Sequence, residues 1–231
     1  MSKKVLVTGG TKGIGYETVK KLKEIGFQVT VVGRNFSEFD IEGVKKVVFD
    51  LEKVDELDKL FDEVGDIDVL VNNAGIDRQR TYDDYPNEDI EKIVNVNLKT
   101  PVKLITLFAD SLIKNNGRVI NVASQAAEIG HKDIWYGITK AGLVNATKSF
   151  ASILGPQGVK LNAVAPGPVE TTMIEDSVYS ERFEKLKERT ILNRIAKPEE
   201  IADVIVWLAK DAPEYINGET IKLNNGAQRI K

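Results

Sequence analysis

Cysteine is absent from the sequence, and histidine occurs once, at His131. The lack of cysteine excludes disulfide bonds, thiolate nucleophiles and cysteine-based zinc sites. A single histidine leaves too few ligands for a histidine-built metal site and rules against a Ser-His-Asp triad, so we expect no bound metal. We assign His131 no role, because a lone histidine is usually a surface or hydrogen-bonding residue. Other side chains must therefore carry any chemistry.

Long apolar runs and an excess of positive charge are also missing. No stretch approaches the roughly 20 apolar residues that a membrane span requires, and the first residues lead directly into a strand-like segment at Val5. The chain has 32 basic and 35 acidic residues, without the positive excess typical of nucleic-acid binding. We therefore expect a cytoplasmic protein with no membrane or nucleic-acid partner.

The composition is that of an ordinary globular protein. Hydrophobic residues make up 42% and charged residues 29% of the 231 positions. The sequence shows no internal repeat, low-complexity tract or linker. We therefore expect residues 1–231 to form a single domain.

Apolar β-branched runs alternate with segments of helical period, which is typical of βαβ units that build a parallel sheet. Strands are expected at Lys4–Thr8, Val29–Val32, Val47–Asp50, Val69–Asn72, Arg118–Ala123, Lys160–Ala165 and Thr220–Leu223. Helices are expected at Ile14–Ile25, Asp55–Val64, Asn87–Leu112, Ile134–Leu154, Glu175–Thr190 and Glu199–Leu208, with Pro198 in the first turn of the last. Residues 35–46 are interpreted as a loop or one helical turn. The pattern predicts a three-layer α/β fold, a doubly wound parallel sheet of about seven strands with helices on both faces.

A glycine-rich turn separates the first predicted strand from the first predicted helix. It reads Thr8-Gly9-Gly10-Thr11-Lys12-Gly13-Ile14-Gly15. Glycines permit positive φ and let backbone N–H groups approach a pyrophosphate, whose charge the helix N-terminus stabilises. Such a turn also occurs without a ligand, so the motif alone leaves both interpretations open. We predict a Rossmann-type dinucleotide site with contacts from Gly9, Thr11, Lys12, Gly13, Ile14 and Gly15.

The end of the second predicted strand reads Gly33-Arg34-Asn35. In dinucleotide-binding folds an acid here binds the ribose 2′-hydroxyl, whereas a basic residue binds a 2′-phosphate. Gly33 stands at the expected acidic position, and Arg34 supplies a planar guanidinium suited to phosphate, with Lys12 as a second positive charge. The alternative is that both are ordinary solvated side chains. With Arg34 and Asn35 at the adenosine ribose, NADP(H) is favoured over NAD(H).

The spacing Thr8-Gly9-x-x-x-Gly13-x-Gly15 resembles that of the short-chain dehydrogenase/reductase family. Five more motifs follow in the family's order and cover nearly the whole chain: Asn72-Asn73-Ala74-Gly75, Asn97, Ser124, Tyr136-x-x-x-Lys140 and Pro166-Gly167-Pro168-Val169-Glu170-Thr171. The runs from Asn162 to Gly167 and from Ile216 to Thr220 look most like those of 3-oxoacyl-[acyl-carrier-protein] reductases.

The catalytic set that this resemblance implies is Asn97, Ser124, Tyr136 and Lys140. Tyr136 and Lys140 are four residues apart, so they share a helix face, and the ammonium is expected to lower the phenol pKa from near 10. Tyr136 would then transfer a proton to the carbonyl oxygen during reduction, while Ser124 donates a hydrogen bond to the same oxygen. The resemblance further implies that Lys140 binds the nicotinamide ribose, and that Asn97 shapes its helix and holds a water beside the lysine.

Further cofactor contacts also follow from the resemblance. Asp50 and Leu51 resemble the pair that contacts adenine, although Asp50 is equally interpreted as a helix cap. The resemblance places Asn73, Ala74 and Gly75 beneath the cofactor, and Pro166, Gly167, Val169 and Thr171 at its nicotinamide end. The substrate is expected to lie among residues 76–85, 125–135 and 172–190, the last of which forms a lid. Trp135 and Ile129 line an apolar pocket or belong to the core.

Three functional hypotheses remain. The first is an NADP(H)-dependent reductase of a ketone or 3-oxoacyl thioester, assembled as a homotetramer or homodimer through the helices at 87–112 and 134–154. The second is a sugar or alcohol dehydrogenase of the same family, which the sequence does not separate from the first. The third is a non-catalytic dinucleotide sensor, which the intact Ser124, Tyr136 and Lys140 disfavour.

Overall fold

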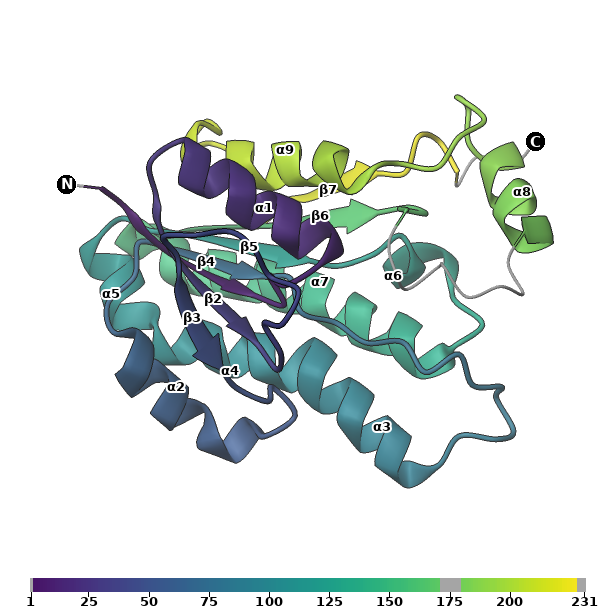
Figure 1. Cartoon of the computed structure of the whole chain (residues 1–231), viewed down its shortest axis with the longest axis horizontal. Coiled ribbons are helices and arrows are strands. Elements are labelled where there is room, and N and C mark those ends of the chain that lie inside the picture. The colour runs from purple at the N-terminus through teal and green to yellow at the C-terminus, as the bar shows by residue number, and fades with distance from the viewer. Residues whose placement is uncertain (1, 171–179, 228–231) are drawn as a thin grey trace.

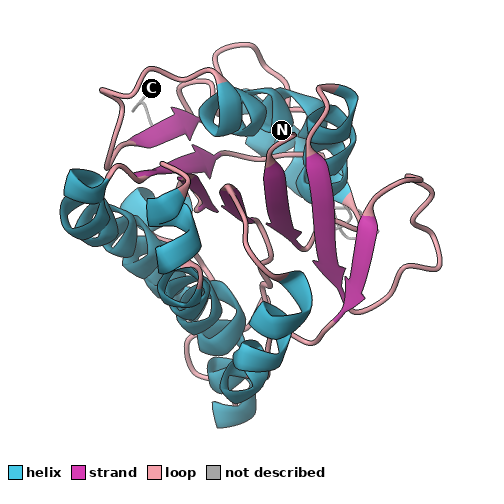
Figure 2. Cartoon of the chain, turned by 90° about the vertical axis from the view of Figure 1, so that its left-hand side faces the viewer, coloured by secondary structure: helices cyan, strands magenta, loops and turns pink. Residues whose placement is uncertain are grey.

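A parallel sheet forms the middle layer of the protein. The computed structural model describes residues 2–170 and 180–227, and within them seven strands follow the order β3-β2-β1-β4-β5-β6-β7. The strands are β1 (Lys4–Thr8), β2 (Gln28–Gly33), β3 (Lys45–Val48), β4 (Val69–Asn72), β5 (Arg118–Val122), β6 (Lys160–Pro166) and β7 (Thr220–Leu223). Helices flank the sheet on both sides (Figure 2). The predicted doubly wound Rossmann fold is confirmed.

The helices form two outer layers. They are α1 (Gly13–Glu24), α2 (Leu57–Val64), α3 (Asn87–Val94), α4 (Thr100–Leu107), α5 (Ala109–Lys114), α6 (Ala126–Ile129), α7 (Ile134–Leu154), α8 (Ser180–Glu188) and α9 (Pro198–Lys210). Helices α1 and α9 cover one face of the sheet, and α2, α4, α5 and α7 cover the other (Figure 1). No helix in the described ranges combines the length and the apolarity that crossing a membrane requires.

Side chains along the strands point alternately to the two faces of the sheet, and each face has its own hydrophobic core. Val5 and Val7 of β1 pack into the cluster that contains Leu22 of α1 and Ile205 of α9. Leu6, between them, belongs to the cluster on the opposite face of the sheet. Because successive side chains of a strand point to opposite faces, a sheet covered on both sides needs continuous apolar strands. The unbroken Val-Leu-Val runs in the sequence reflect this burial.

The segment between β2 and β3 is a loop, so the alternative of a helical turn in residues 35–46 is wrong. Phe39 anchors this loop through edge-on ring contacts with Phe36 and Tyr16, whose centroids lie 5.6 and 5.9 Å away. Strand β3 begins at Lys45 and ends at Val48, so the predicted strand end at Asp50 is also wrong. Packing of the aromatic rings holds the loop without a helix.

The single helix predicted at residues 87–112 is divided. A π-helical turn, η2 (Asn95–Lys99), separates α3 from α4, and α5 follows α4. Pro101 lies in the first turn of α4 and has no N–H to donate to the carbonyl of Asn97, four residues earlier. A π-turn here accommodates the missing bond, and such turns are frequent at functional sites. The division therefore places Asn97 in an irregular turn.

Two other boundaries concern the substrate segments. The short helix α6 lies inside the segment 125–135, which the sequence pattern did not reveal as helical. In the segment 172–190, α8 spans Ser180–Glu188, and the predicted helical residues before Ser180 lie outside the described residues. Pro198 occupies the first turn of α9, as predicted.

Candidate active site

The glycine-rich turn joins β1 to α1 in a tightly packed arrangement. Gly9 and Gly13 adopt positive φ values of 63° and 56°. A Cβ added to Gly15 would lie 2.2 Å from the Gly9 carbonyl oxygen and 2.4 Å from Nδ2 of Asn73. A side chain at Gly15 would therefore collide with the turn itself, which explains why glycine is required there.

The start of α1 has the properties of an anion site. Lys12 precedes the helix in an extended conformation, no side chain caps the helix, and its first turn contains no acidic residue. The N–H groups of the first turn are therefore left for another acceptor, and the helix dipole favours a negative charge at this end. These residues fit the pyrophosphate of a dinucleotide.

Thr8 and Asn73 fasten the glycine turn to the end of β4. Nδ2 of Asn73 donates to the carbonyl oxygens of Thr8 (3.0 Å) and Gly9 (2.9 Å). Oγ1 of Thr8 accepts from the backbone N–H groups of Asn73 and Ala74, each at 3.1 Å. A Cβ added to Gly9 would lie 2.8 Å from Cα of Ala74. The predicted segment Asn73–Gly75 is thus held against the turn by Thr8, which belongs to the glycine motif but was assigned no role from the sequence.

Arg34 and Lys12, the two predicted phosphate ligands, are both exposed. Neither forms an ion pair with a carboxylate in the part of the chain that the structure describes. A Cβ added to Gly33 would lie 2.7 Å from Cγ2 of Thr11, so Thr11 packs against the strand end. Asn35 Oδ1 accepts from the N–H of Ser37 (2.8 Å), which turns the chain away after Arg34. This end of the cleft offers free positive charge to a phosphate.

Asp50 does not cap a helix. Its Oδ1 accepts from the N–H of Glu52 at 3.1 Å, whereas the 3-10 turn η1 (Val54–Glu56) begins after Lys53. The alternative of a helix cap is therefore wrong, and adenine contact by Asp50 and the buried Leu51 stays a prediction.

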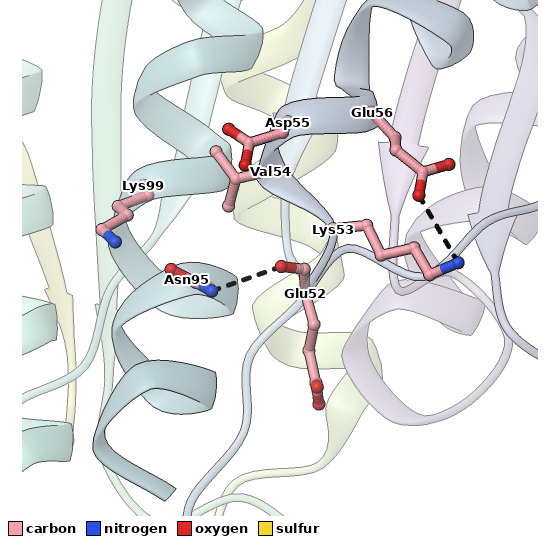
Figure 3. Close-up of a pocket in the computed structure, with 7 residues that line it drawn as sticks. All are labelled: Glu52, Lys53, Val54, Asp55, Glu56, Asn95 and Lys99. Carbon is pink, nitrogen blue, oxygen red and sulfur yellow. Dashed lines mark hydrogen bonds and ion pairs between the residues drawn. The ribbon is translucent and has the colours of Figure 1, made fainter. Parts of the chain in front are cut away.

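The residues that directly follow Leu51 in the chain line a polar pocket of about 370 Å³ (Figure 3). It is lined by Glu52, Lys53, Val54, Asp55, Glu56, Asn95 and Lys99. Asn95 closes one side by donating from Nδ2 to the Glu52 carbonyl oxygen at 3.3 Å. The lining contains none of the predicted site residues, and we assign it no function.

Ser124, Tyr136 and Lys140 come together beyond the carboxyl end of β5. Tyr136 and Lys140 lie one turn apart on α7, and the side chains of Ser124 and Tyr136 share a hydrogen bond. Nζ of Lys140 donates to the Val122 carbonyl oxygen at 2.8 Å and lies 5.7 Å from the centroid of the Tyr136 ring. The three predicted catalytic side chains thus meet at one point.

Burial moves the pKa values of Tyr136 and Lys140 in opposite directions. It raises the pKa of Tyr136 to about 12, although the hydrogen bond from Ser124 acts the other way and the carboxyls of Asp77 and Asp133 add to the rise. It lowers the pKa of Lys140 to about 8. The expectation that Lys140 lowers the pKa of Tyr136 is wrong for this structure, because desolvation of the phenolate dominates and the ammonium bonds Val122. The phenol therefore stays protonated near neutral pH, as a proton donor requires.

Asn97 is held by backbone contacts. Its Oδ1 accepts from the N–H of Ile76 and its Nδ2 donates to the Ile76 carbonyl oxygen, both at 2.8 Å. Nδ2 also lies 3.3 Å from Oγ1 of Thr139 on α7. A Cβ added to Gly75 would lie 3.2 Å from Nζ of Lys140 and 3.5 Å from Oδ1 of Asn97. Asn97 thus fixes the chain after Gly75, and its predicted water stays a prediction.

The predicted nicotinamide end lies beyond β6. Pro166 ends the strand, Gly167 donates its N–H to the Leu223 carbonyl oxygen at 2.9 Å, and Val169 is buried. Thr171 lies outside the described residues. Oε1 of Gln125 is buried without a hydrogen-bond partner among the described residues, 3.3 Å from the place of a Cβ on Gly167. An orphaned acceptor here fits a ligand N–H donor such as a carboxamide.

Other residues around Tyr136 were not identified from the sequence. His131, to which we assigned no role, has its ring centroid 5.0 Å from that of Tyr136. Asp77 and Asp133 bring two carboxyl groups close enough to influence the phenol. Ile129 is 51% exposed, so its interpretation as a core residue is wrong, whereas Trp135 is half-buried. No motif marks these positions; only their place at strand ends signals them.

Known proteins resemble this chain along nearly its whole length. A family model described as Enoyl-(Acyl carrier protein) reductase matches residues 9–228. The chain is 37% identical over 238 residues to a 3-oxoacyl-[acyl-carrier-protein] reductase FabG of Aquifex aeolicus, covering 96% of this chain and 95% of that protein. It is 30% identical over 239 residues to a gluconate 5-dehydrogenase of Gluconobacter oxydans, covering 96% and 93%.

Solved structures share the fold. A putative betaketoacyl-ACP reductase superposes with a TM-score of 0.89 at 29% identity, covering 99% of this chain and 98% of that one. A 4-hydroxyisoleucine dehydrogenase complexed with NADH superposes with a TM-score of 0.94, covering both chains fully, and its 23% identity is evidence of the fold alone. With the family match along nearly the whole length, these similarities identify the chain as an oxidoreductase of the short-chain dehydrogenase/reductase family.

Proposed function

We propose that the protein reduces the carbonyl of a ketone or 3-oxoacyl thioester to an alcohol, with NADPH as the reductant. The observation that carries this proposal is the half-buried Tyr136 side chain, which is hydrogen-bonded to Ser124 and lies one helical turn from the buried Lys140. Similarity to the Aquifex aeolicus reductase supports the substrate class. With a pKa of about 12, the Tyr136 phenol carries its proton at neutral pH and is able to donate it during reduction.

The residues would divide the chemistry as follows. Bound NADPH supplies a hydride to the carbonyl carbon. Ser124 and Tyr136 hold the carbonyl oxygen, and the phenol proton passes to it as negative charge develops. Lys140, charged below a pKa of about 8, lies where it stabilises the phenolate that remains. Tyr136 then regains its proton from solvent, and both the alcohol and the oxidised cofactor leave.

Free positive charge supports the choice of NADPH. Arg34 and Lys12 are exposed and unpaired at the adenosine end of the cleft, as far as the structure describes the chain. A guanidinium binds a phosphate with two parallel hydrogen bonds, which a 2′-hydroxyl does not offer.

A second candidate is the oxidation of a sugar or other polyhydroxy alcohol. The specific observation in its favour is the half-buried carboxyl group of Asp77 near Tyr136, because a carboxylate accepts hydrogen bonds from hydroxyl groups. The similarity to gluconate 5-dehydrogenase points in the same direction. A non-catalytic dinucleotide sensor, the third candidate, has no need of the Ser124–Tyr136–Lys140 arrangement.

We also propose that the chain works in the cytoplasm as a homodimer or homotetramer formed through α4 and α7. Ile138 and Ile153 on α7 are 49% and 62% exposed in the single chain. Apolar side chains exposed on a long helix are typical of a face that another chain covers.

The first test combines cofactor binding with turnover. Binding of NADPH and NADH is measured by fluorescence, and turnover is measured on acetoacetyl-CoA, diketones and simple sugars. We expect Tyr136→Phe to retain NADPH binding and to lose at least about a hundredfold in kcat, the scale of general acid catalysis. Tyr215→Phe, at a fully exposed tyrosine, serves as the matched control and is expected to match the wild type. Unchanged turnover in Tyr136→Phe would contradict the mechanism, and binding without turnover on a broad panel would favour the sensor.

A further inference from the structure

Asp133 is a buried acid, 1% exposed, at the amino end of α7. Its Oδ1 accepts from the N–H of Tyr136 at 3.0 Å, which is the bond of an ordinary helix cap. The same carboxylate also accepts from the N–H of Arg78 (2.9 Å) and from the hydroxyl of Tyr85 (3.0 Å to Oδ1 and 3.2 Å to Oδ2). One side chain therefore joins the start of the catalytic helix to a distant loop.

That loop is the segment 76–85 between β4 and α3, which lies on the predicted substrate side. A serine satisfies a helix N-terminus as well as an aspartate does, so capping alone does not require a carboxylate at position 133. Burying a carboxylate is costly unless several donors satisfy it. Here Arg78 and Tyr85 supply donors from the loop, so the loop and the buried charge depend on each other.

Asp77 completes the connection. Its side chain shares a hydrogen bond with Asp133, and its Oδ1 accepts from the N–H of Gln79 at 2.6 Å. Burial raises the pKa of Asp77. Burial also acts to raise the pKa of Asp133, but the bonds from Tyr136, Arg78 and Tyr85 outweigh it and lower that pKa. Of the two carboxyl groups, Asp133 therefore has the lowered pKa and Asp77 the raised one.

The start of the loop is fastened to the same helix by a second route. Asn97 bonds both backbone groups of Ile76 and contacts Thr139, one turn beyond the start of α7. Asn97 therefore fixes the loop at Ile76, and Asp133 fixes it at Arg78 and Tyr85. Between these points the loop follows the first turns of the helix that carries Tyr136.

We propose that Asp133 is a positioning residue. Its bonds to Arg78 and Tyr85, here called the clasp, hold the loop 76–85 against the first turn of α7 and so determine the position of Tyr136 relative to the substrate carbonyl. The catalytic part of this inference rests on the proposed function. The clasp itself is a property of the fold and is measured separately from turnover.

The test compares Asp133→Ser, Asp133→Ala and Tyr85→Phe. Serine keeps the helix cap but is too short to reach Arg78 and Tyr85, whereas alanine removes cap and clasp together. Tyr85→Phe removes one loop bond and leaves the cap intact. Tyr215→Phe, at a fully exposed tyrosine outside the loop, is the matched control. Loop order is followed by amide hydrogen exchange of residues 76–85 and by trypsin cleavage after Arg78 and Arg80.

We expect Asp133→Ser to unfold at a higher temperature than Asp133→Ala, because it keeps the helix cap. In the loop 76–85, the two variants should show equally fast amide hydrogen exchange and equally fast trypsin cleavage. Its kcat should fall on the order of tenfold to a hundredfold, the cost of a misplaced catalytic group. The KM for NADPH should stay near the wild-type value, since the clasp lies away from the glycine turn. Tyr85→Phe should show the same changes to a smaller degree, and adding it to Asp133→Ser should have little further effect, because both act through one contact.

Wild-type loop exchange and kcat in Asp133→Ser would overturn the proposal and reduce Asp133 to a helix cap. Wild-type behaviour of Tyr85→Phe together with additive effects in the double variant would also overturn it. If the wild type turns over nothing on the substrate panel, the proposed function fails, whereas faster loop exchange in Asp133→Ser would still support the clasp.

Discussion

Tyr136 and Lys140 share one desolvated region, and desolvation disfavours the charged form of both side chains. The phenol keeps its proton to a pKa of about 12, and the lysine loses its proton at about 8. For the reduction of a carbonyl, the phenol must be protonated and the lysine charged. Both conditions hold below the pKa of Lys140, so for the proposed reduction we expect this lysine to set the upper pH limit.

A pH profile tests this assignment. We expect kcat for reduction to be level near neutral pH and to fall as the pH rises through about 8, because the pKa of Lys140 is lowered and its charge is lost there. Lys140→Arg is the control, because a guanidinium stays charged throughout this range. If the arginine variant is active, its profile should lack the fall near pH 8. If kcat falls near pH 8 in both the wild type and Lys140→Arg, the titrating group is not Lys140.

The proposed preference for NADPH over NADH also depends on single residues. We expect Arg34→Ala to raise the Kd for NADPH on the order of tenfold or more, the scale of a lost charge-assisted hydrogen bond to phosphate. The Kd for NADH should change little, since its ribose carries no phosphate. Fluorescence titration with both cofactors measures this, with Arg189→Ala, at another exposed arginine, as the control. Equal weakening of both cofactors would contradict the NADPH preference.

At the scale of elements, the regular segments were predictable and the irregular ones were not. Strands β1, β4 and β7 and helix α7 begin and end where the apolar pattern places them. The π-turn η2 was missed because the side-chain pattern continues through it, while the change lies in backbone hydrogen bonding around Pro101. The end of β3 was misplaced because Phe49 continues the apolar run beyond the last pairing, Gly33 with Val48.

Glu200 illustrates how one element is fixed at its start. Its Oε2 accepts from the N–H of Lys197 at 2.8 Å, and its two oxygens bind Arg194 at 2.7 and 2.6 Å. The hydrogen bonds from Arg194, followed by that from Lys197, lower the pKa of Glu200 to about 2. We expect Glu200→Gln to lower the free energy of unfolding by at most about 1 kcal/mol at neutral pH, since the pair is solvent-exposed.

The pH dependence of this loss has a defined sign. Because the folded pKa is depressed, the stabilisation is present above the ordinary carboxyl value of 4.5 and disappears as the pH falls toward about 2. Urea unfolding at neutral and acidic pH should therefore show the difference between wild type and Glu200→Gln shrinking in acid. Glu199→Gln, at the neighbouring exposed acid, is expected to have no such effect. A difference that is constant with pH would exclude Glu200 as its source.

At the scale of the whole molecule, the parallel sheet brings the site together. The glycine turn, Asn73, Ser124 and Gly167 follow β1, β4, β5 and β6, and in a parallel sheet these ends lie along one edge. The chain order reverses between β1 and β4, which is where ligands bind in open α/β sheets. Residues far apart in sequence thus meet because of strand order alone.

The proposed assembly into a dimer or tetramer is also a property of the whole molecule. We expect the wild type to sediment as a dimer or tetramer and Ile138→Asp to sediment as a smaller species, because a buried charge at an apolar interface is costly. Val48→Asp, at a 72% exposed residue on the edge strand β3, is the control and should keep the wild-type mass. A monomeric wild type, or an Ile138→Asp variant of unchanged mass, would contradict assembly through α7.

The sequence by itself determined the layer architecture and the glycine turn, because periodicity and glycine spacing are local properties of the chain, and its resemblance to the short-chain dehydrogenase/reductase family pointed to Ser124, Tyr136 and Lys140. Only the tertiary structure decided that burial outweighs the lysine charge at Tyr136, that Gln125 carries an orphaned oxygen, and that Asp133 bonds Arg78 and Tyr85. Desolvation and contacts between distant segments depend on what surrounds a group in space, and no local pattern encodes that environment.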